Sequence, residues 1–222
     1  MEQKNYIASL EEQRKLFLFG PVTEQSALDL VVKIMYLDSL SQEPVELYIF
    51  SPGGSVLAGA TLYSAMKMVA SPIHTINMGL AASMAAIILA AGDKRFVYPT
   101  AQTMIHQPLI QGGIGGQATD VSINSFELNR WKEWTIEVLT QETGLDKETI
   151  ESLIERDTFL TPQEAKAYNI VDVILQPSEY ANKKMVTLDD IPYDNVLRQS
   201  VPPHLKNIIF QEQVRNGENV VR

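Results

Sequence analysis

Few side chains in this sequence could act as a base or a nucleophile at neutral pH. The 222 residues include three histidines and no cysteine, which excludes thiol catalysis, disulfides and cysteine-ligated metals. His74 lies within an apolar run and is expected to be structural, while His204 follows two prolines in a polar region. His106 ends a short apolar run just before Gln107-Pro108, and strand ends often present functional side chains. His106 is therefore the candidate base, with a satisfied core histidine as the alternative.

The candidate nucleophile is Ser83, in the segment Met78-Gly-Leu-Ala-Ala-Ser-Met-Ala-Ala86. Small neighbours let a substrate backbone approach the hydroxyl. A serine at a helix start also lies beside free backbone N–H groups and the positive end of the helix dipole, which suits stabilisation of an oxyanion. The same pattern is typical of an N-cap serine in a tightly packed helix, and the segment alone leaves both interpretations open.

A second small-residue segment, Ser51-Pro-Gly-Gly54, follows an apolar run. Its amides have no bulky side chain in front of them, so it is either the second half of an oxyanion hole or a simple turn. The chain has no phosphate-binding Gly-Lys-Ser/Thr loop, no dinucleotide-binding glycine pattern and no metal-ligand spacing of histidines. We therefore expect neither a cofactor nor a metal.

The elements that position these residues alternate between short apolar runs and helix-period segments, which predicts an α/β domain. Strands are expected near residues 16–19, 45–50, 73–77, 95–97, 103–105 and 170–175. Helices are expected near residues 25–40, 56–69, 83–91, 120–142, 146–155 and 162–169. The apolar face of the helix at 25–40 is expected to hold Leu28, Val31, Val32, Met35 and Leu40.

The helix at 120–142 should be roughly 35 Å long, which exceeds what one compact domain needs. A glycine-rich ribbon at 111–117 precedes it, and Gly144 follows where a left-handed residue often ends a helix. Its large apolar side chains are Phe126, Leu128, Trp131, Trp134, Ile136 and Leu139. A lone protruding helix should not expose so much apolar surface. We expect burial against another subunit, with cover by the C-terminal segment as the alternative.

The net charge of −9 argues against nucleic acid and anionic membranes as partners. The N-terminus has no secretory signal pattern, and the most apolar stretch, 78–92, is too short to span a bilayer, so a cytoplasmic location is expected. After Gln176 the composition becomes polar with scattered prolines. Residues 1–14 and 177–222 are therefore expected to flank a single domain at 15–176.

Taken in order, five segments of the chain resemble the proteolytic subunit of the Clp protease family. They are Ser51-Pro-Gly-Gly54, Met78-Gly-Leu-Ala-Ala-Ser-Met84, Met104-Ile-His-Gln-Pro-Leu109, Gly116-Gln-Ala-Thr-Asp120 and Arg156-Asp-Thr-Phe-Leu-Thr161. Phe50, Leu80 and Ala85 depart from the residues usual in the family, as expected of a divergent paralogue.

The resemblance implies that Ser83 is the nucleophile, His106 the base and Asp157 the carboxylate that orients His106. The residues alone do not choose Asp157 over Asp93, Asp120 or Asp172. The resemblance also implies an oxyanion hole made by the backbone N–H groups of Gly54 and Met84. The substrate-contact residues that it implies are Gly53, Ser55, Val56, Pro108, Leu109 and Ile110.

The implied fold is a crotonase-like α/β spiral with a protruding handle helix at about 110–143. The handle is expected to interleave between two stacked heptameric rings, with Glu155 and Arg156 at the ring-to-ring contact. The implied function is an ATP-dependent-type serine endopeptidase subunit that hydrolyses unfolded polypeptides inside this chamber, with a AAA+ unfoldase or an active paralogue as partner. A non-catalytic ring subunit and a crotonase-superfamily acyl-CoA enzyme are the alternatives.

Overall fold

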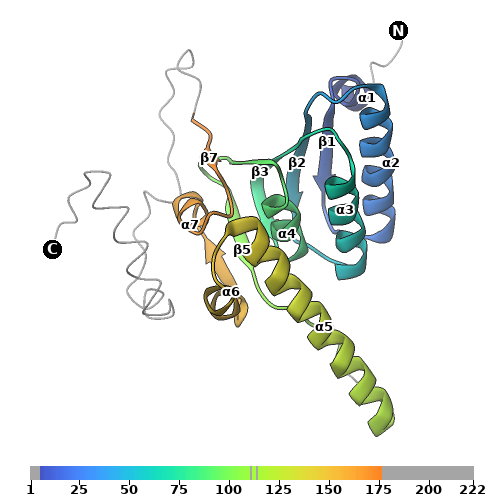
Figure 1. Cartoon of the computed structure of the whole chain (residues 1–222), viewed down its shortest axis with the longest axis vertical. Helices are drawn as coiled ribbons and strands as arrows, with labels where there is room; N and C mark the ends of the chain where they lie inside the picture. The colour runs from blue at the N-terminus through green and yellow to red at the C-terminus, as the bar shows by residue number, and fades with distance from the viewer. Residues whose placement is uncertain (1–5, 111, 114, 177–222) are drawn as a thin grey trace, which may run out of the picture.

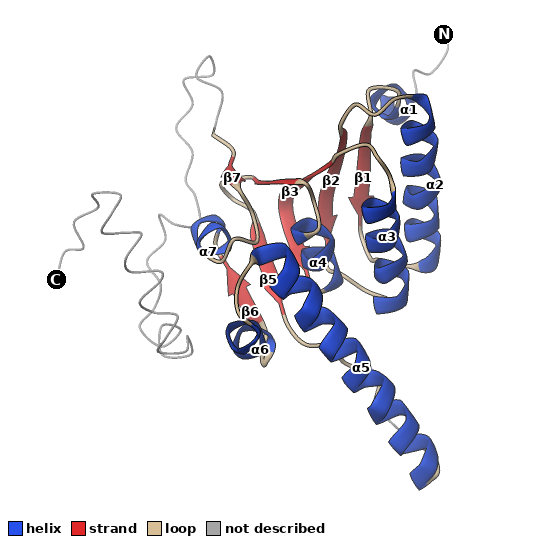
Figure 2. Cartoon of the chain, viewed as in Figure 1, coloured by secondary structure: helices blue, strands red, loops and turns tan. Residues whose placement is uncertain are grey.

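The computed structural model describes residues 6–110, 112–113 and 115–176, and it is a mixed α/β structure with helices packed on a central sheet (Figures 1 and 2). The strands are β1 (Lys15–Phe19), β2 (Val45–Ser51), β3 (Ile73–Ala82), β4 (Lys94–Val97), β5 (Gln102–Ile105), β6 (Thr158–Leu160) and β7 (Val173–Ile174). The helices are α1 (Tyr6–Glu11), α2 (Glu24–Leu40), α3 (Val56–Met68), α4 (Met84–Ala90), α5 (Ala118–Thr143), α6 (Lys147–Ile154) and α7 (Pro162–Ala167).

The sheet divides at β3, which is the longest strand. The order is β1-β2-β3-β4-β7, and all of these strands run parallel. The first part of β3, through Asn77, pairs with β4, whereas Leu80–Ala82 at its end pair with β5. β6 then pairs antiparallel with β5. The end of β3 therefore lies between the Ser51–Gly54 turn and β5.

Helix α2 forms where the sequence predicts it, behind a capping box in which Thr23 and Ser26 hydrogen bond to each other's backbone. The expectation about its apolar face was wrong. Four other residues, Ala27, Leu30, Ile34 and Leu37, are buried in the core. Of the five expected residues, Val31 is half-buried against the core, whereas Leu28, Val32, Met35 and Leu40 are 57–61% exposed. The helix is apolar on two faces, and periodicity cannot tell which of them packs on the sheet.

Helices α1 and α2 and the chain entering β1 are held together by polar contacts that the sequence did not predict. Lys33 of α2 forms an ion pair with Glu11 at 2.7 Å. The guanidinium of Arg14 donates to four backbone carbonyl oxygens in and beyond the end of α2, those of Leu37, Ser41, Glu43 and Pro44. Helix α1 and strand β6 were likewise absent from the sequence-based expectation, and β7 is shorter than the strand predicted there.

Helix α5 has a buried base and an exposed outer part that extends away from the sheet (Figure 1). The expectation that its apolar residues need an outside partner was wrong for Ile136 and Leu139, which are already buried in this subunit. Phe126, by contrast, is 64% exposed. As expected, Gly144 ends the helix in the left-handed conformation, with φ of 74°. None of the helices among the described residues is long and apolar enough to cross a membrane.

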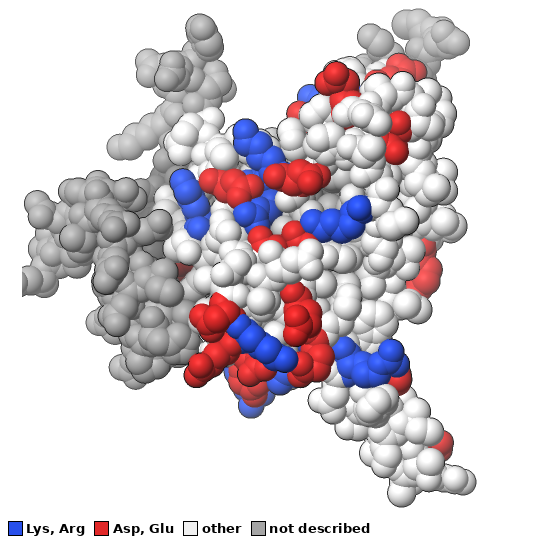
Figure 3. Space-filling model, in the orientation of Figure 1, with Lys and Arg blue, Asp and Glu red and all other residues white. Residues whose placement is uncertain are grey.

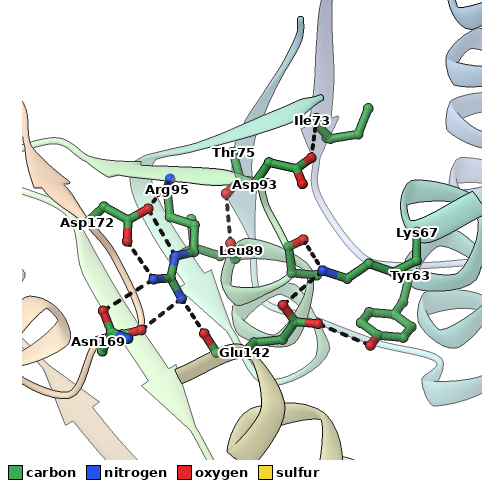
Figure 4. A network of polar contacts seen from close by, with 11 residues as sticks. Tyr63, Lys67, Ile73, Thr75, Leu89, Asp93, Arg95, Glu142, Asn169 and Asp172 are labelled. Carbon is green, nitrogen blue, oxygen red and sulfur yellow. Dashed lines mark hydrogen bonds and ion pairs between the residues drawn. The ribbon is translucent and has the colours of Figure 1, made fainter. Parts of the chain in front are cut away.

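Buried Arg95 fixes the base of α5 to the edge of the sheet (Figure 4). Its guanidinium donates to the carbonyl oxygens of Glu142 and Asn169 at 2.8 Å and also binds the carboxylate of Asp172. The Asn169 side chain donates to the Thr143 carbonyl oxygen at 2.6 Å, so another end carbonyl of α5 is satisfied. Burial alone would raise the pKa of Asp172, but the hydrogen bonds and charge of Arg95 hold that pKa below its usual value.

Candidate active site

Ser83 stands between the end of β3 and the first turn of α4 in a strained conformation, with φ of 55° and ψ of −126°. Its backbone N–H donates to the Met104 carbonyl oxygen at 2.8 Å, which locks the turn to β5. The side chain makes no helix-cap hydrogen bond. Instead, Ser83 Oγ lies 2.8 Å from His106 Nε2. The hydroxyl is therefore directed at the histidine, and the N-cap interpretation does not describe it.

His106 and Asp157 are brought together by the antiparallel pair β5–β6. In its register Thr103 is opposite Leu160 and Ile105 is opposite Thr158, so the next step places His106 opposite Asp157. His106 Nδ1 lies 2.9 Å from Asp157 Oδ1. The His106 side chain is 13% exposed, whereas that of Asp157 is 63% exposed. Ser83, His106 and Asp157 thus form one hydrogen-bonded series.

The other three aspartates that the sequence left open have structural partners elsewhere. Asp93 accepts from the backbone N–H of Ile73, Asp120 accepts from the backbone N–H of Gln117, and Asp172 binds Arg95. His74 lies within β3, where its ring meets Phe96 edge-on. His204 lies outside the described residues. The structure therefore brings His106 together with Asp157 rather than with these alternatives.

The Gly53-Gly54 turn packs closely between Ser83 and the chain at Val22. A Cβ atom on Gly53 would lie 2.5 Å from the Ala82 carbonyl oxygen and 2.7 Å from Ser83 Cβ. A Cβ on Gly54 would overlap the carbonyl oxygen of Val22. Within the part of the chain that the structure describes, the N–H groups of Gly54 and Met84 donate to no protein acceptor. Two backbone donors are therefore available beside Ser83.

The residues predicted to contact substrate lie in two segments, one from this turn into the start of α3 and the other after β5. Ser55 caps α3, and its N–H already donates to the Val22 carbonyl oxygen at 2.8 Å; Val56 is the first residue of α3. Beyond β5, Pro108 is half-buried, whereas Leu109 and Ile110 are 55% and 39% exposed. Substrate contact by these residues stays a prediction.

The turn between α6 and β6 carries the predicted ring-contact residues Glu155 and Arg156, both exposed. Lys132 of α5 forms a 3.7 Å ion pair with Glu155. On the face shown in Figure 3, acidic and basic side chains gather over α6 and the adjoining part of α5. One ion pair between these two helices joins Lys147 of α6 to Glu133 of α5 at 2.7 Å. Among the described residues, no group of His, Asp and Glu side chains could hold a metal ion.

Comparison with known proteins identifies the family of this chain. Residues 1–178 match the family model described as Clp protease. The chain is 42% identical over 167 residues to the ATP-dependent Clp protease proteolytic subunit 1 of Chlamydia abortus, which covers 74% of this chain and 87% of the relative. It is also 42% identical over 169 residues to the protein of the same name from Chlamydia muridarum, with 75% and 88% covered. This chain belongs to the Clp protease family.

Proposed function

We propose that the chain is a serine endopeptidase subunit of the ATP-dependent type, which hydrolyses peptide bonds of unfolded polypeptides. The observation that carries the proposal is the series of hydrogen bonds from Ser83 through His106 to Asp157, at 2.8 and 2.9 Å. Members of the Clp protease family are serine peptidases, and the same three residue types form the triad of serine hydrolases on unrelated folds.

The geometry supports acyl transfer through Ser83. His106 Nε2 accepts the hydroxyl proton as Ser83 Oγ attacks the peptide carbonyl carbon, and it returns that proton to the leaving amine. The Nδ1–H group of His106 donates to Asp157, which holds the correct tautomer and stabilises the imidazolium. Water then replaces the amine: His106 Nε2 takes a proton from it as its oxygen attacks the acyl carbon, the bond from that carbon to Ser83 Oγ breaks, and His106 returns the proton to Oγ.

The negative charge of the tetrahedral intermediate falls on the former carbonyl oxygen. The N–H groups of Gly54 and Met84 would donate to this oxygen, since neither has another protein acceptor among the described residues. An extended peptide would lie between the Gly53–Val56 segment on one side and Pro108, Leu109 and Ile110 on the other, with main-chain hydrogen bonds.

We further propose that the subunit has the crotonase-like spiral fold, with α5 as its handle, and that it assembles into two stacked heptameric rings. Leu28, Val32, Met35 and Leu40 leave a continuous exposed apolar face on α2. Ile123 and Phe126, three residues apart on the same side of the helix, leave another on the outer part of α5. Exposed apolar faces of this kind are typical of subunit interfaces. The chamber, in the cytoplasm, would receive polypeptides from a AAA+ unfoldase or work with an active paralogue.

Ser83→Ala tests the proposal, with Ser64→Ala as control because Ser64 is an exposed serine of α3. Ser83→Ala should abolish both fluorophosphonate labelling and hydrolysis of fluorogenic peptides while the native mass stays unchanged. Losses of a triad residue typically cost several orders of magnitude in rate. Equal hydrolysis by both variants would exclude Ser83 as nucleophile. A parental protein that never labels would be a non-catalytic ring subunit, and turnover of acyl-CoA independent of Ser83 would indicate a crotonase-type enzyme.

A further inference from the structure

The turn that carries Asp157 is tied to the residue that follows His106. α6 ends at Ile154, and the last carbonyl oxygens of a helix have no partner within the helix. The backbone N–H of Gln107 donates to the Ile154 carbonyl oxygen at 2.7 Å. The side-chain amide of Gln107 donates to the Glu155 carbonyl oxygen at 3.0 Å. One residue therefore satisfies two of the carbonyl groups that lead into the Asp157 turn.

A second donor holds the same turn from its other end. The hydroxyl of Thr158 lies 2.7 Å from the Leu153 carbonyl oxygen and 3.2 Å from that of Arg156. Thr158 also pairs with Ile105 in the β5–β6 register. Gln107 and Thr158 thus fix the backbone on both sides of Asp157, and each neighbours one member of the His106–Asp157 pair.

The placement of Asp157 depends on these contacts because its own side chain is poorly enclosed. That side chain is 63% exposed, so water competes for the carboxylate and one hydrogen bond to His106 holds it only weakly in a single geometry. The ring of His106, by contrast, is only 13% exposed. The fraction of molecules in which the Asp157 carboxylate is aligned with His106 therefore depends on the backbone conformation of the turn that carries Asp157.

We propose that Gln107 is a positioning residue for the reaction: its side-chain amide holds the Glu155 carbonyl so that Asp157 stays aligned with His106. This inference rests on the proposed function of Ser83, His106 and Asp157. Without the amide, the Glu155 carbonyl group is free to rotate, and the fraction of molecules in which Asp157 is aligned with His106 falls. A single neutral hydrogen bond of this kind corresponds to roughly a 3- to 10-fold change in that population.

Gln107→Met removes the amide and keeps the length of the side chain. Gln102→Met on β5 is the matched control, because among the described residues the Gln102 side chain makes no hydrogen bond. The rate of fluorophosphonate labelling should fall roughly 3- to 10-fold in Gln107→Met and stay at the parental value in Gln102→Met. The native mass should be the parental one in both variants, because both keep the side chains of the proposed ring-contact residues Glu155 and Arg156.

A double-mutant cycle separates positioning from a general structural role. In an Asp157→Asn background, Gln107→Met should cause no further loss, since the group that it positions no longer acts as a carboxylate. Thr158→Val should behave in the same way, which gives a second variant if Gln107→Met unfolds. The inference would be overturned if Gln107→Met lowered the labelling rate by the same factor in the Asp157→Asn background as in the parent. It would also be overturned if Gln107→Met labelled at the parental rate. Persistent labelling of Ser83→Ala would instead remove the proposed function.

Discussion

Gly53→Ala is the sharpest test of how the glycine turn supports Ser83. The new methyl group would stand 2.5 Å from the Ala82 carbonyl oxygen, 2.7 Å from Ser83 Cβ and 3.0 Å from the Met84 nitrogen. All three atoms belong to the strained turn that presents the hydroxyl and the proposed oxyanion donor. No flexible side chain can move aside, so the backbone of one turn or the other must shift.

The size of the effect follows from these distances. Ordinary carbon–oxygen contacts begin near 3.4 Å, so relief of the overlap with Ala82 takes a displacement of about 1 Å. A misplacement of that size costs about 100-fold in rate, and loss of one oxyanion donor costs about 100- to 1,000-fold. The positive φ of 87° adds strain of about 1–2 kcal/mol to the folded state.

Gly20→Ala is the matched control, because Gly20 has a φ of 79° and an added methyl group would meet no atom within 4 Å. It should lose a similar amount of stability and keep the parental kcat/KM for a fluorogenic peptide. Gly53→Ala should lose at least about 100-fold in kcat/KM, measured per assembled particle. If the two variants hydrolyse the peptide equally well, the close approach of Gly53 to Ser83 has no role in the reaction.

Three further outcomes are expected. Hydrolysis per assembled particle should fall in acid, because only neutral His106 accepts the serine proton; a rate independent of acidity would exclude His106 as base. Arg156→Ala should lower activity and also shift the native mass toward smaller species. Full activity in intact double rings would show that Arg156 does not couple assembly to activity. Asp172→Asn should destabilise the fold by about 2–3 kcal/mol at neutral pH, since it removes the charged partner of Arg95. The Asp172 pKa is lowered by folding, so that stabilisation is complete above its unfolded pKa of about 4 and is lost as pH falls through the folded pKa; chemical denaturation at several pH values should show the difference between parent and variant shrinking in acid.

Local signals in the sequence predicted the elements that carry the chemistry. The helices expected near residues 146–155 and 162–169 and the left-handed Gly144 all occur, because the N-cap at Asp146, the capping box at Thr161 and Gly144 each depend only on neighbouring residues. The strand-to-helix junction at Ser83 was predicted for the same reason. Its positive φ was not predicted, since it depends on how β3 meets β5. Its contact with His106 was implied by the family resemblance and not by local signals.

The sequence-based expectations were wrong or incomplete where tertiary packing, and not local sequence, selects one of several possible structures. The α2 pattern fits two apolar faces, and the sheet buries the one with Ala27 and Ile34. Strand β6 has only three residues and exists because it pairs with β5. Asp157 could not be chosen from the sequence by chemistry alone, because its place opposite His106 is a matter of register between distant segments.

Because Asp157 lies beside β6, which follows β5 in the chain, the site is completed in a fixed order during protein synthesis. Ser83 precedes Asp157 by 74 residues (157 minus 83). At about 5–20 residues per second, the nascent chain therefore holds Ser83 for about 4–15 s before Asp157 has been translated. His106 can meet Ser83 during that interval without a carboxylate to orient it. A chain that stalls before β6 would carry an incomplete triad, so the peptidase proposed here would gain its full activity only after Asp157 has been translated and β6 has paired with β5.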